Sequence, residues 1–214
     1  MLTTVSFKEE LINSITHGLG ALLSIGGTAV AIVWAALYGD AYSVVSAAIY
    51  GAMLIVLYVM STLYHALTNK TAKKIFRIFD HCSIFLLIAG TYTPFTLCAL
   101  RGALGWTIFG IIWGLTVLGI VFNAISLEKF KVFSMICYVV MGWLIIIAFK
   151  PLMHAIGFMP GTVLLLAGGV SYTVGIVFFA LKNVPFMHSI WHLFVLLGSV
   201  LHYFSILFSA LPLK

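Results

Sequence analysis

The chain has 214 residues, of which 63% are hydrophobic and 7% are charged, and its mean hydropathy is +1.20. Soluble domains carry roughly 25% charged residues, so these few charges cannot cover the surface of a water-soluble protein of this size. A disordered chain is excluded because disorder requires low hydrophobicity and high charge. A transmembrane β-barrel is disfavoured because its signature is short alternating segments. The composition therefore predicts an integral membrane protein in a lipid bilayer, and the net charge of +6 is read as a topology signal rather than a sign of nucleic-acid binding.

Seven apolar runs approach the length of about 20 residues that a helix needs to cross a bilayer. They are residues 16–38, 42–66, 79–100, 103–126, 132–149, 160–181 and 187–211. Short segments with charged, glycine or proline residues separate them. We therefore expect an all-α polytopic membrane protein with a single domain over residues 1–214. It would be a bundle of seven transmembrane helices, preceded by a cytoplasmic lead-in helix over residues 1–15.

Positively charged residues are distributed unevenly between the two ends of these expected helices. Eight lie on the side of the N-terminus: Lys8, Lys70, Lys73, Lys74, Arg77, Lys129, Lys131 and Lys182. Three lie on the other side: Arg101, Lys150 and Lys214. Cytoplasmic loops carry an excess of Lys and Arg, so the bias places the N-terminus in the cytoplasm and the C-terminus outside.

Ionisable residues within a membrane span are unfavourable and suggest a functional site. His65 ends the second run, Asp80 begins the third, and His188 and His192 begin the seventh. The expected topology puts all four at one depth near the cytoplasmic face. That topology follows from the Lys and Arg residues alone, so the agreement between these positions is independent support for a site.

The spacing of these residues is typical of a metal site. His188 and His192 are separated by four residues, so both lie on one helix face, about 6 Å apart along the axis. With His65 they would supply three ligands and leave an open position, as in catalytic zinc sites. Nitrogen ligands favour zinc over magnesium or calcium. Asp80 would hold a water molecule or orient a ligand, and Ser61 lies one turn before His65.

Each of these signals has a simpler explanation when taken alone. A pair of histidines at this spacing occurs by chance, a histidine at the end of a span can lie among lipid headgroups, and Ser61 can hydrogen-bond to the Leu57 carbonyl. Their combination on three helices at one depth favours the metal site. His202 lies about 21 Å from His188 along the helix, too far for the same ion, and is expected in an interior polar lining.

Glu10, Asn13 and His17 share one face of the predicted N-terminal helix. On the expected topology they lie beside the metal site, where they would gate it or support its ligands. A hydrated helix on the membrane surface explains the same pattern equally well.

Four segments of the sequence, taken together, resemble the motifs of one known protein family. They are E-x-x-N-S-I-T-H at residues 10–17, S-T-L-Y-H at 61–65, F-D-H-C-S-I-F-L-L-I-A-G-T-Y-T-P-F at 79–95 and M-H-S-I-W-H at 187–192. Together they resemble the haemolysin III family, the bacterial branch of the progestin and adipoQ receptor superfamily. The resemblance extends over nearly the whole chain.

This resemblance implies seven helices and a zinc ion held near the cytoplasmic face by His65, His188 and His192. It also implies that Ser61 and Asp80 correspond to the serine and aspartate conserved in the family. Relatives among the adiponectin receptors and alkaline ceramidases are regarded as lipid amide hydrolases. The bacterial branch takes its name from a reported haemolytic, pore-forming activity.

Three functions remain open from the sequence. The first is a zinc hydrolase of the bacterial plasma membrane, acting on a lipid amide or ester and contributing to membrane lipid homeostasis. In it a zinc-activated water is the nucleophile, Asp80 is the base or water orienter and Ser61 an oxyanion or supporting donor. The second is a pore-forming cytolysin, which the lack of an evident ring of charged residues disfavours. The third is a sensor or receptor with a structural zinc. No nucleic-acid partner is expected, and the oligomeric state stays open.

Overall fold

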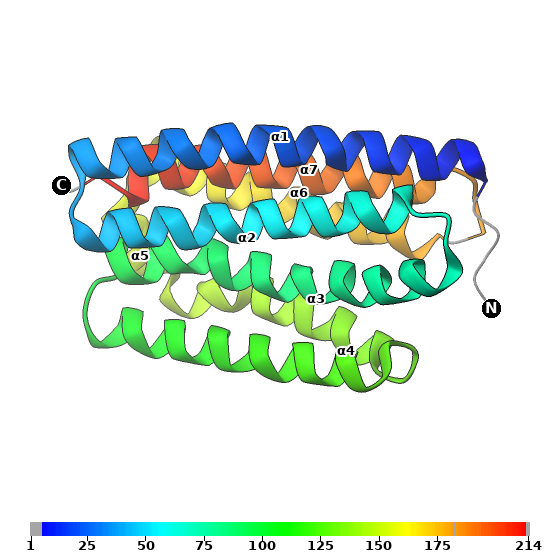
Figure 1. Cartoon of the computed structure of the whole chain (residues 1–214). Helices are drawn as coiled ribbons and strands as arrows, with labels where there is room; N and C mark the ends of the chain where they lie inside the picture. Colours follow the sequence, from blue (N-terminus) through cyan, green and yellow to red (C-terminus); the bar gives the residue numbers. More distant parts are fainter. Residues whose placement is uncertain (1–5, 182, 213–214) are drawn as a thin grey trace.

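The computed structural model describes residues 6–181 and 183–212, and all regular structure in these ranges is helical. The α-helices are α1 (Phe7–Tyr38), α2 (Ala41–Ala66), α3 (Lys70–Pro94), α4 (Ala103–Trp143), α5 (Phe149–Ile156), α6 (Val163–Ala180) and α7 (Met187–Ser205). Short π- and 3₁₀-helical segments join or extend them: η1 (Phe95–Ala99), η2 (Leu144–Ala148), η3 (Gly157–Thr162) and η4 (Ile206–Ala210). The long helices lie side by side in one bundle (Figure 1).

Five helical stretches in the described residues are long and apolar enough to cross a membrane. They are α1, α2, Lys70–Ala99, Ala103–Ala180 and Met187–Ala210. The sequence-based expectation of a bundle of seven separate transmembrane helices is therefore wrong. The difference arises in Ala103–Ala180, a stretch of 78 residues that takes the place of three expected runs.

The physical reason is that the expected breaks do not end the helical structure. Residues 128–131 are charged or aromatic, and long charged side chains are good helix formers. Pro151 lies in the first turn of α5, where its missing N–H is not needed. The backbone leaves helical geometry at Ser126 and Met159 instead. Figure 1 shows α4 turning back at the end of the bundle where α1 begins.

Polar residues define where the first three helices begin. Ser6 and Glu9 form a capping box at the start of α1. Asp40 caps α2 by accepting a hydrogen bond from the Ser43 N–H. Asn69 caps α3 in the same way. Because the segments between these helices are only a few residues long, α1 packs against α2 and α2 against α3 as neighbours.

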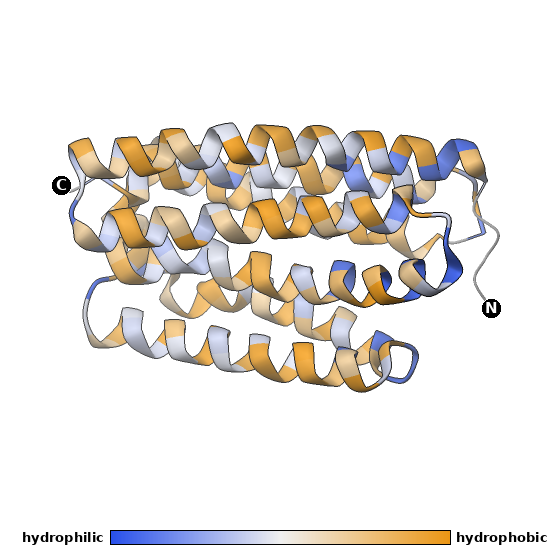
Figure 2. Cartoon of the chain, in the orientation of Figure 1, coloured by the Kyte–Doolittle hydropathy of each residue, from blue (hydrophilic) through white to orange (hydrophobic). Residues whose placement is uncertain are grey.

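The outer surface of the bundle is apolar. Leu22, Val132 and Ile147 expose 70%, 70% and 78% of their surface, and many other large apolar side chains face outward. Contact of this surface with water would be unfavourable, whereas contact with lipid chains is not. Figure 2 shows hydrophobic residues along the helices and hydrophilic ones gathered at the end where α1 begins and α2 meets α3. These features are those of an integral membrane protein.

Glycines allow the helices to approach closely. Gly20 of α1 lies against the Tyr58 ring of α2, and Gly119 of α4 lies against the Phe85 ring of α3. A Cβ atom at either glycine would collide with the ring. Small residues at such contacts are the usual means of close packing between membrane helices. The close packing of α1 on α2, together with the contact of α1 with α7, brings three helix ends together at the polar end of the bundle.

Candidate metal centre

Three imidazoles meet at this polar end of the bundle. His65 lies near the end of α2, while His188 and His192 lie in the first turns of α7. One ring nitrogen from each lies within 4.8 Å of the others. His65 and His192 are buried and His188 is partly buried. We call these three residues the histidine cluster.

Within the cluster, the two histidines of α7 point nitrogens at each other. The Nε2 atoms of His188 and His192 are 3.1 Å apart. Zinc–nitrogen bonds are 2.0–2.1 Å long, so two such bonds at a tetrahedral angle separate the nitrogens by about 3.3 Å. The observed spacing is therefore close to that of two ligands sharing one ion. It follows from the helix itself, because residues four apart lie on one face.

His65 is oriented by a carboxylate. Its Nδ1 is 2.7 Å from Glu10 Oε2. A carboxylate only accepts, so Nδ1 carries the hydrogen, and in the neutral imidazole, the form that binds a metal, Nε2 carries the lone pair. This Nε2 is buried and has no hydrogen-bond partner in the described residues. An unpaired buried nitrogen points to a missing ligand, and a carboxylate–histidine pair is the usual support of a metal ligand. By this observation the cluster fits a metal ion.

His192 is held by α1 on two sides. Its Nδ1 is 3.3 Å from the Asn13 carbonyl oxygen and 3.4 Å from Thr16 Oγ1. Because the carbonyl accepts, Nδ1 carries the hydrogen, and the lone pair of Nε2 faces the rest of the cluster. The ring of His17 stacks on the His192 ring, with centroids 3.5 Å apart and planes 10° apart. Helix α1 therefore sets both the tautomer and the plane of this imidazole.

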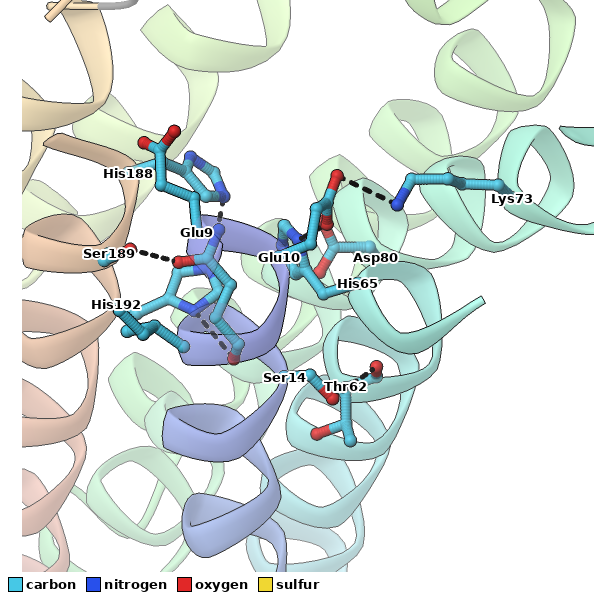
Figure 3. A network of polar contacts seen from close by, with 12 residues as sticks. Glu9, Glu10, Ser14, Thr62, His65, Lys73, Asp80, His188, Ser189 and His192 are labelled. Atoms are coloured by element: carbon cyan, nitrogen blue, oxygen red, sulfur yellow. Dashed lines mark hydrogen bonds and ion pairs between the residues drawn. The ribbon is translucent and has the colours of Figure 1, made fainter. Parts of the chain in front are cut away.

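Two further contacts tie α1 to its neighbours around the cluster (Figure 3). Glu10 Oε1 is 2.9 Å from Lys73 Nζ of α3, and Ser189 Oγ of α7 donates to Asn13 Oδ1 at 2.6 Å. Asn13 is fully buried, so its bond to Ser189 replaces a contact with water. The supporting residues expected from the sequence, Glu10, Asn13 and His17, thus all lie at the cluster.

The turn that precedes α7 is also fixed by α1. Phe186 adopts a left-handed backbone conformation with φ of 64°, which is uncommon for a residue other than glycine. Its backbone N–H donates to the Glu9 carboxylate. Since His188 follows two residues later, this contact sets where α7 starts and where its first imidazole lies.

Ser61 and Asp80 lie near the cluster without bonding to it. Ser61 is buried in α2, one turn before His65. Asp80 is in α3, where its Oδ2 is 3.6 Å from His81 Nδ1, and Figure 3 draws it on the α3 side of the network. In the described part of the chain, neither side chain forms a hydrogen bond with the histidine cluster.

Three residues of this network were not singled out as site residues from the sequence. In the sequence Lys73 indicates only the topology, whereas in the structure it pairs with Glu10. Thr16 and Ser189 lie inside the motifs at residues 10–17 and 187–192, and each is next to a predicted site residue in the chain. That adjacency is the one signal that pointed to them, since a hydroxyl residue in a helix usually bonds to its own backbone.

Two apolar cavities lie between α3, α4, α6 and α7, close to the cluster. The smaller, of about 30 Å³, is lined by His81 and by Phe179, whose ring centroid is 5.8 Å from that of His188. The larger, of about 130 Å³, reaches His202. Both are lined by Trp191, so they adjoin each other. An apolar space therefore lies inside the bundle, and Phe179, which lines its smaller part, contacts the ring of His188.

Comparison with known proteins decides the family. The model of the family described as haemolysin-III related matches residues 5–203. The chain belongs to the haemolysin III family. The resemblance seen in its motifs is thereby confirmed, and with it membership of the progestin and adipoQ receptor superfamily. The family and the helices together identify an integral membrane protein.

Several relatives match over nearly their whole length. Hemolysin-3 of Bacillus cereus is 49% identical over 205 residues, covering 96% of this chain and 93% of the relative. The hemolysin-3 homolog of Bacillus subtilis (strain 168) is 48% identical over 203 residues, covering 95% of each. The human monocyte to macrophage differentiation factor is 29% identical over 204 residues, covering 92% of this chain and 83% of the relative.

Proposed function

We propose that this haemolysin III protein is a zinc-dependent hydrolase that cleaves an amide or ester bond of a membrane lipid, with a role in membrane lipid homeostasis. One observation carries the proposal: the imidazoles of His65, His188 and His192 each offer a nitrogen within 4.8 Å of the others, and the buried Nε2 of His65, whose ring is oriented by Glu10, lacks a partner in the described residues. The bacterial relatives support a location in the plasma membrane.

The histidine cluster offers three neutral nitrogen ligands, which suits zinc better than magnesium or calcium. A zinc ion held in this way would act as a Lewis acid and lower the pKa of a bound water molecule to about 7. All other tasks fall to the protein, which must orient the ligands, position the lipid, exclude bulk water and move protons.

The two carboxylates near the cluster are suited to different tasks. Both oxygens of Glu10 are engaged, one by His65 and one by Lys73. We therefore assign Glu10 the task of orienting His65 as a metal ligand. Asp80 forms no short side-chain hydrogen bond in the described residues, its nearest ionic partner being His81 at 3.6 Å. We assign Asp80 as the base that takes a proton from the attacking water.

The reaction then requires few groups. The water oxygen bonds to the carbonyl carbon, the bond from that carbon to nitrogen or oxygen breaks, and the proton held by Asp80 passes to the leaving amine or alcohol. We assign Ser61, on the same helix as His65 and one turn away, as a hydrogen-bond donor toward the carbonyl oxygen. The apolar cavities between α3 and α7 would receive the acyl chain and exclude water.

The test is release of free fatty acid by purified protein of measured zinc content. Labelled ceramide and labelled phospholipids are offered in vesicles, with and without a zinc chelator. We expect release from at least one lipid class, its loss with the chelator or in His192→Ala, and its return when zinc is added back. Zinc-loaded protein that releases fatty acid from neither class would refute the proposal.

Two measurements on the same samples separate the remaining functions. A fluorescent dye trapped in the vesicles reports lysis, the property in the names of the Bacillus relatives. If the protein releases dye but no fatty acid, and His188→Ala releases dye as well, the result would indicate membrane disruption. A melting temperature that falls on chelation, with no turnover before it, would indicate a structural zinc.

A further inference from the structure

Hydrogen bonds join α1 and α7, which pack against each other in the bundle (Figure 1), at two separate levels. Beside the histidine cluster, Ser189 Oγ of α7 donates to Asn13 Oδ1 of α1 at 2.6 Å. Farther along the helices, the Tyr203 hydroxyl of α7 donates to the Gly27 carbonyl oxygen of α1 at 2.9 Å. Asn13 and Gly27 are 14 residues apart, which is about 21 Å along the axis. The two levels set the separation of the helices over this stretch.

Between these levels, α1 offers little side-chain volume to its neighbours. Gly20, Ser24 and Gly27 are spaced by four and three residues, so they lie on one face of the helix. All three line a groove of about 350 Å³, together with residues of α2 and α7. The α7 side of the groove extends from Leu196 to Phe204, about 12 Å along the axis.

The groove is continuous with the surface that contacts lipid. Leu23, Val200 and Phe204 line it, and they expose 53%, 36% and 40% of their surface as part of the apolar exterior of the bundle. Ser24 lies 17 residues after the start of α1 and 14 before its end, about 25 Å and 21 Å along the axis. The groove therefore opens at the depth of the hydrocarbon core, where lipid chains are its neighbours.

The hydroxyl groups that line the groove already have partners in the protein. Ser24 Oγ donates to the Gly20 carbonyl oxygen at 2.7 Å, and the Tyr58 hydroxyl donates to Ser199 Oγ at 2.7 Å. The fourth hydroxyl is that of Tyr203, which holds α1 as described above. A polar headgroup in the groove would lose its water without gaining these partners, which is unfavourable. A hydrocarbon chain loses nothing there.

The groove is separate from the cavities assigned to the substrate. The larger of these cavities lies on the side of α7 that faces α3, α4 and α6, and in the described residues it shares no lining residue with the groove. The Ser199 hydroxyl lies between them. It is 2.7 Å from the Tyr58 hydroxyl, which lines the groove, and 2.7 Å from the Tyr172 hydroxyl, which lines the cavity. A chain in the groove is thus not placed for the proposed reaction.

We propose that the groove binds the distal part of one acyl chain of a bilayer lipid, which fills the space between α1 and α7 as a ligand and not as a substrate. The two hydrogen-bonded levels keep the helices from closing the groove, and an unfilled space would cost its lining atoms their van der Waals contacts. A chain from the adjoining bilayer restores these contacts. The inference does not depend on lipid hydrolysis.

The experiment labels the full chain in nanodiscs of phosphatidylcholine, a small part of which carries a photoactivatable diazirine near the end of one acyl chain. Mass spectrometry after irradiation locates the label. Val117 of α4 is the reference, because it is 57% exposed, lies outside the groove, and is 14 residues from the helix end that lies beside the end of α1 (Figure 1). Leu23 should be labelled about tenfold more strongly than Val117, since burial of only two further methylene groups shifts occupancy by that factor.

A substitution that fills the groove provides the second measurement. Val200→Trp places an indole where the chain is expected, and Leu197→Trp is the matched control, because Leu197 faces lipid on the same helix but does not line the groove. Native mass spectrometry of protein released from the nanodiscs should find one retained lipid in wild type and in Leu197→Trp, and none in Val200→Trp. In Val200→Trp the label on Leu23 should fall to the level of Val117.

The outcomes decide between the proposed lipid and the other possible occupants. Equal labelling of Leu23 and Val117 in the wild type would overturn the proposal. Links between two protein chains at the groove, without lipid label, would assign it to a second copy and would also overturn it. A lipid retained equally in Val200→Trp and Leu197→Trp would place the bound lipid elsewhere. If Val200→Trp does not fold, the labelling ratio in the wild type decides.

Discussion

Glu10 and His65 form the shortest link between α1 and the histidine cluster, with 2.7 Å between Oε2 and Nδ1. The other carboxylate oxygen of Glu10 is 2.9 Å from Lys73 Nζ. One side chain thus connects α1, α2 and α3 and fixes which nitrogen of His65 bears the hydrogen. The orientation of His65, a candidate metal ligand, therefore depends on α1, a helix that contributes no imidazole to the histidine cluster.

Glu10→Gln tests this dependence. The amide keeps the size of the side chain but removes the charge that orients His65, so zinc affinity should fall about 10- to 100-fold. Competition with a chromophoric chelator measures it. Lys73→Met is the control, because it leaves the bond between Glu10 and His65 in place, and it should change the affinity far less. Equal affinity of Glu10→Gln and wild type would show that the carboxylate does not support the ligand.

His192→Ala removes one member of the cluster and should reduce the bound zinc well below that of the wild type. Elemental analysis of purified protein gives the ratio. His154→Ala serves as control, since His154 is exposed on α5, away from the cluster. A chelator should also lower the melting temperature of the wild type, because a ligand at 100 times its Kd stabilises by about 2.7 kcal/mol. Full zinc content in His192→Ala would contradict the assignment.

Asn13 and Ser189 should be energetically coupled. Their bond of 2.6 Å joins α1 to α7 in a buried place, and removing one partner leaves the other unpaired. Asn13→Ala and Ser189→Ala should each lower the free energy of unfolding by about 1–3 kcal/mol. The double variant should lose less than the sum, by roughly 1 kcal/mol. Additive effects in thermal or denaturant unfolding would mean that the bond does not contribute to stability.

Asp40 lies at the end of the bundle opposite the histidine cluster, and its ionisation should make the stability of the fold depend on pH. Burial opposes its ionisation, but the Ser43 N–H and the Arg101 guanidinium favour it, so the pKa of Asp40 lies below its ordinary value. A carboxyl with a lowered pKa stabilises the fold above its unfolded pKa, and the effect is lost as pH falls through the folded pKa. The contribution should therefore be complete at neutral pH and absent in strong acid.

Two substitutions separate the ion pair of Asp40 from its helix cap. Asp40→Asn keeps a capping oxygen but loses the pair with Arg101, so stability at neutral pH should fall by about 0.2–1 kcal/mol. In strong acid the variant and the wild type should unfold alike. Asp40→Ala also loses the cap, at a further cost of about 1 kcal/mol. A difference between Asp40→Asn and wild type that is the same at every pH would refute the role of the charge.

Much of the site was accessible from the sequence because it depends on local helical spacing. The separation of four residues between His188 and His192 requires both rings to share a face, and the charge bias placed His65 at the same depth. Lys73 and Thr16 could not be assigned, because their partners are set by the rotation of α1 against α3 and α7. Rotation depends on packing such as Gly20 against Tyr58, which hydropathy does not report.

The number of membrane-crossing helices was predicted less well, for a physical reason. Charged and proline residues between apolar runs predict helix ends, yet charged side chains are compatible with helix and Pro151 falls in a first turn. The backbone departs from helical geometry at Ser126 and Met159. Met159 precedes Pro160, whose ring disfavours the α conformation at the residue before it. Ser126 carries no comparable signal in the sequence.

The histidine cluster combines residues from the first third of the chain with residues from its final helix. During synthesis the ribosome completes α2 before α7. While the intervening helices are made, His65 is therefore present without His188 and His192. Assembly of the candidate metal site is consequently a late step of biogenesis. A chain truncated before α7 would lack two of the three imidazoles of the histidine cluster.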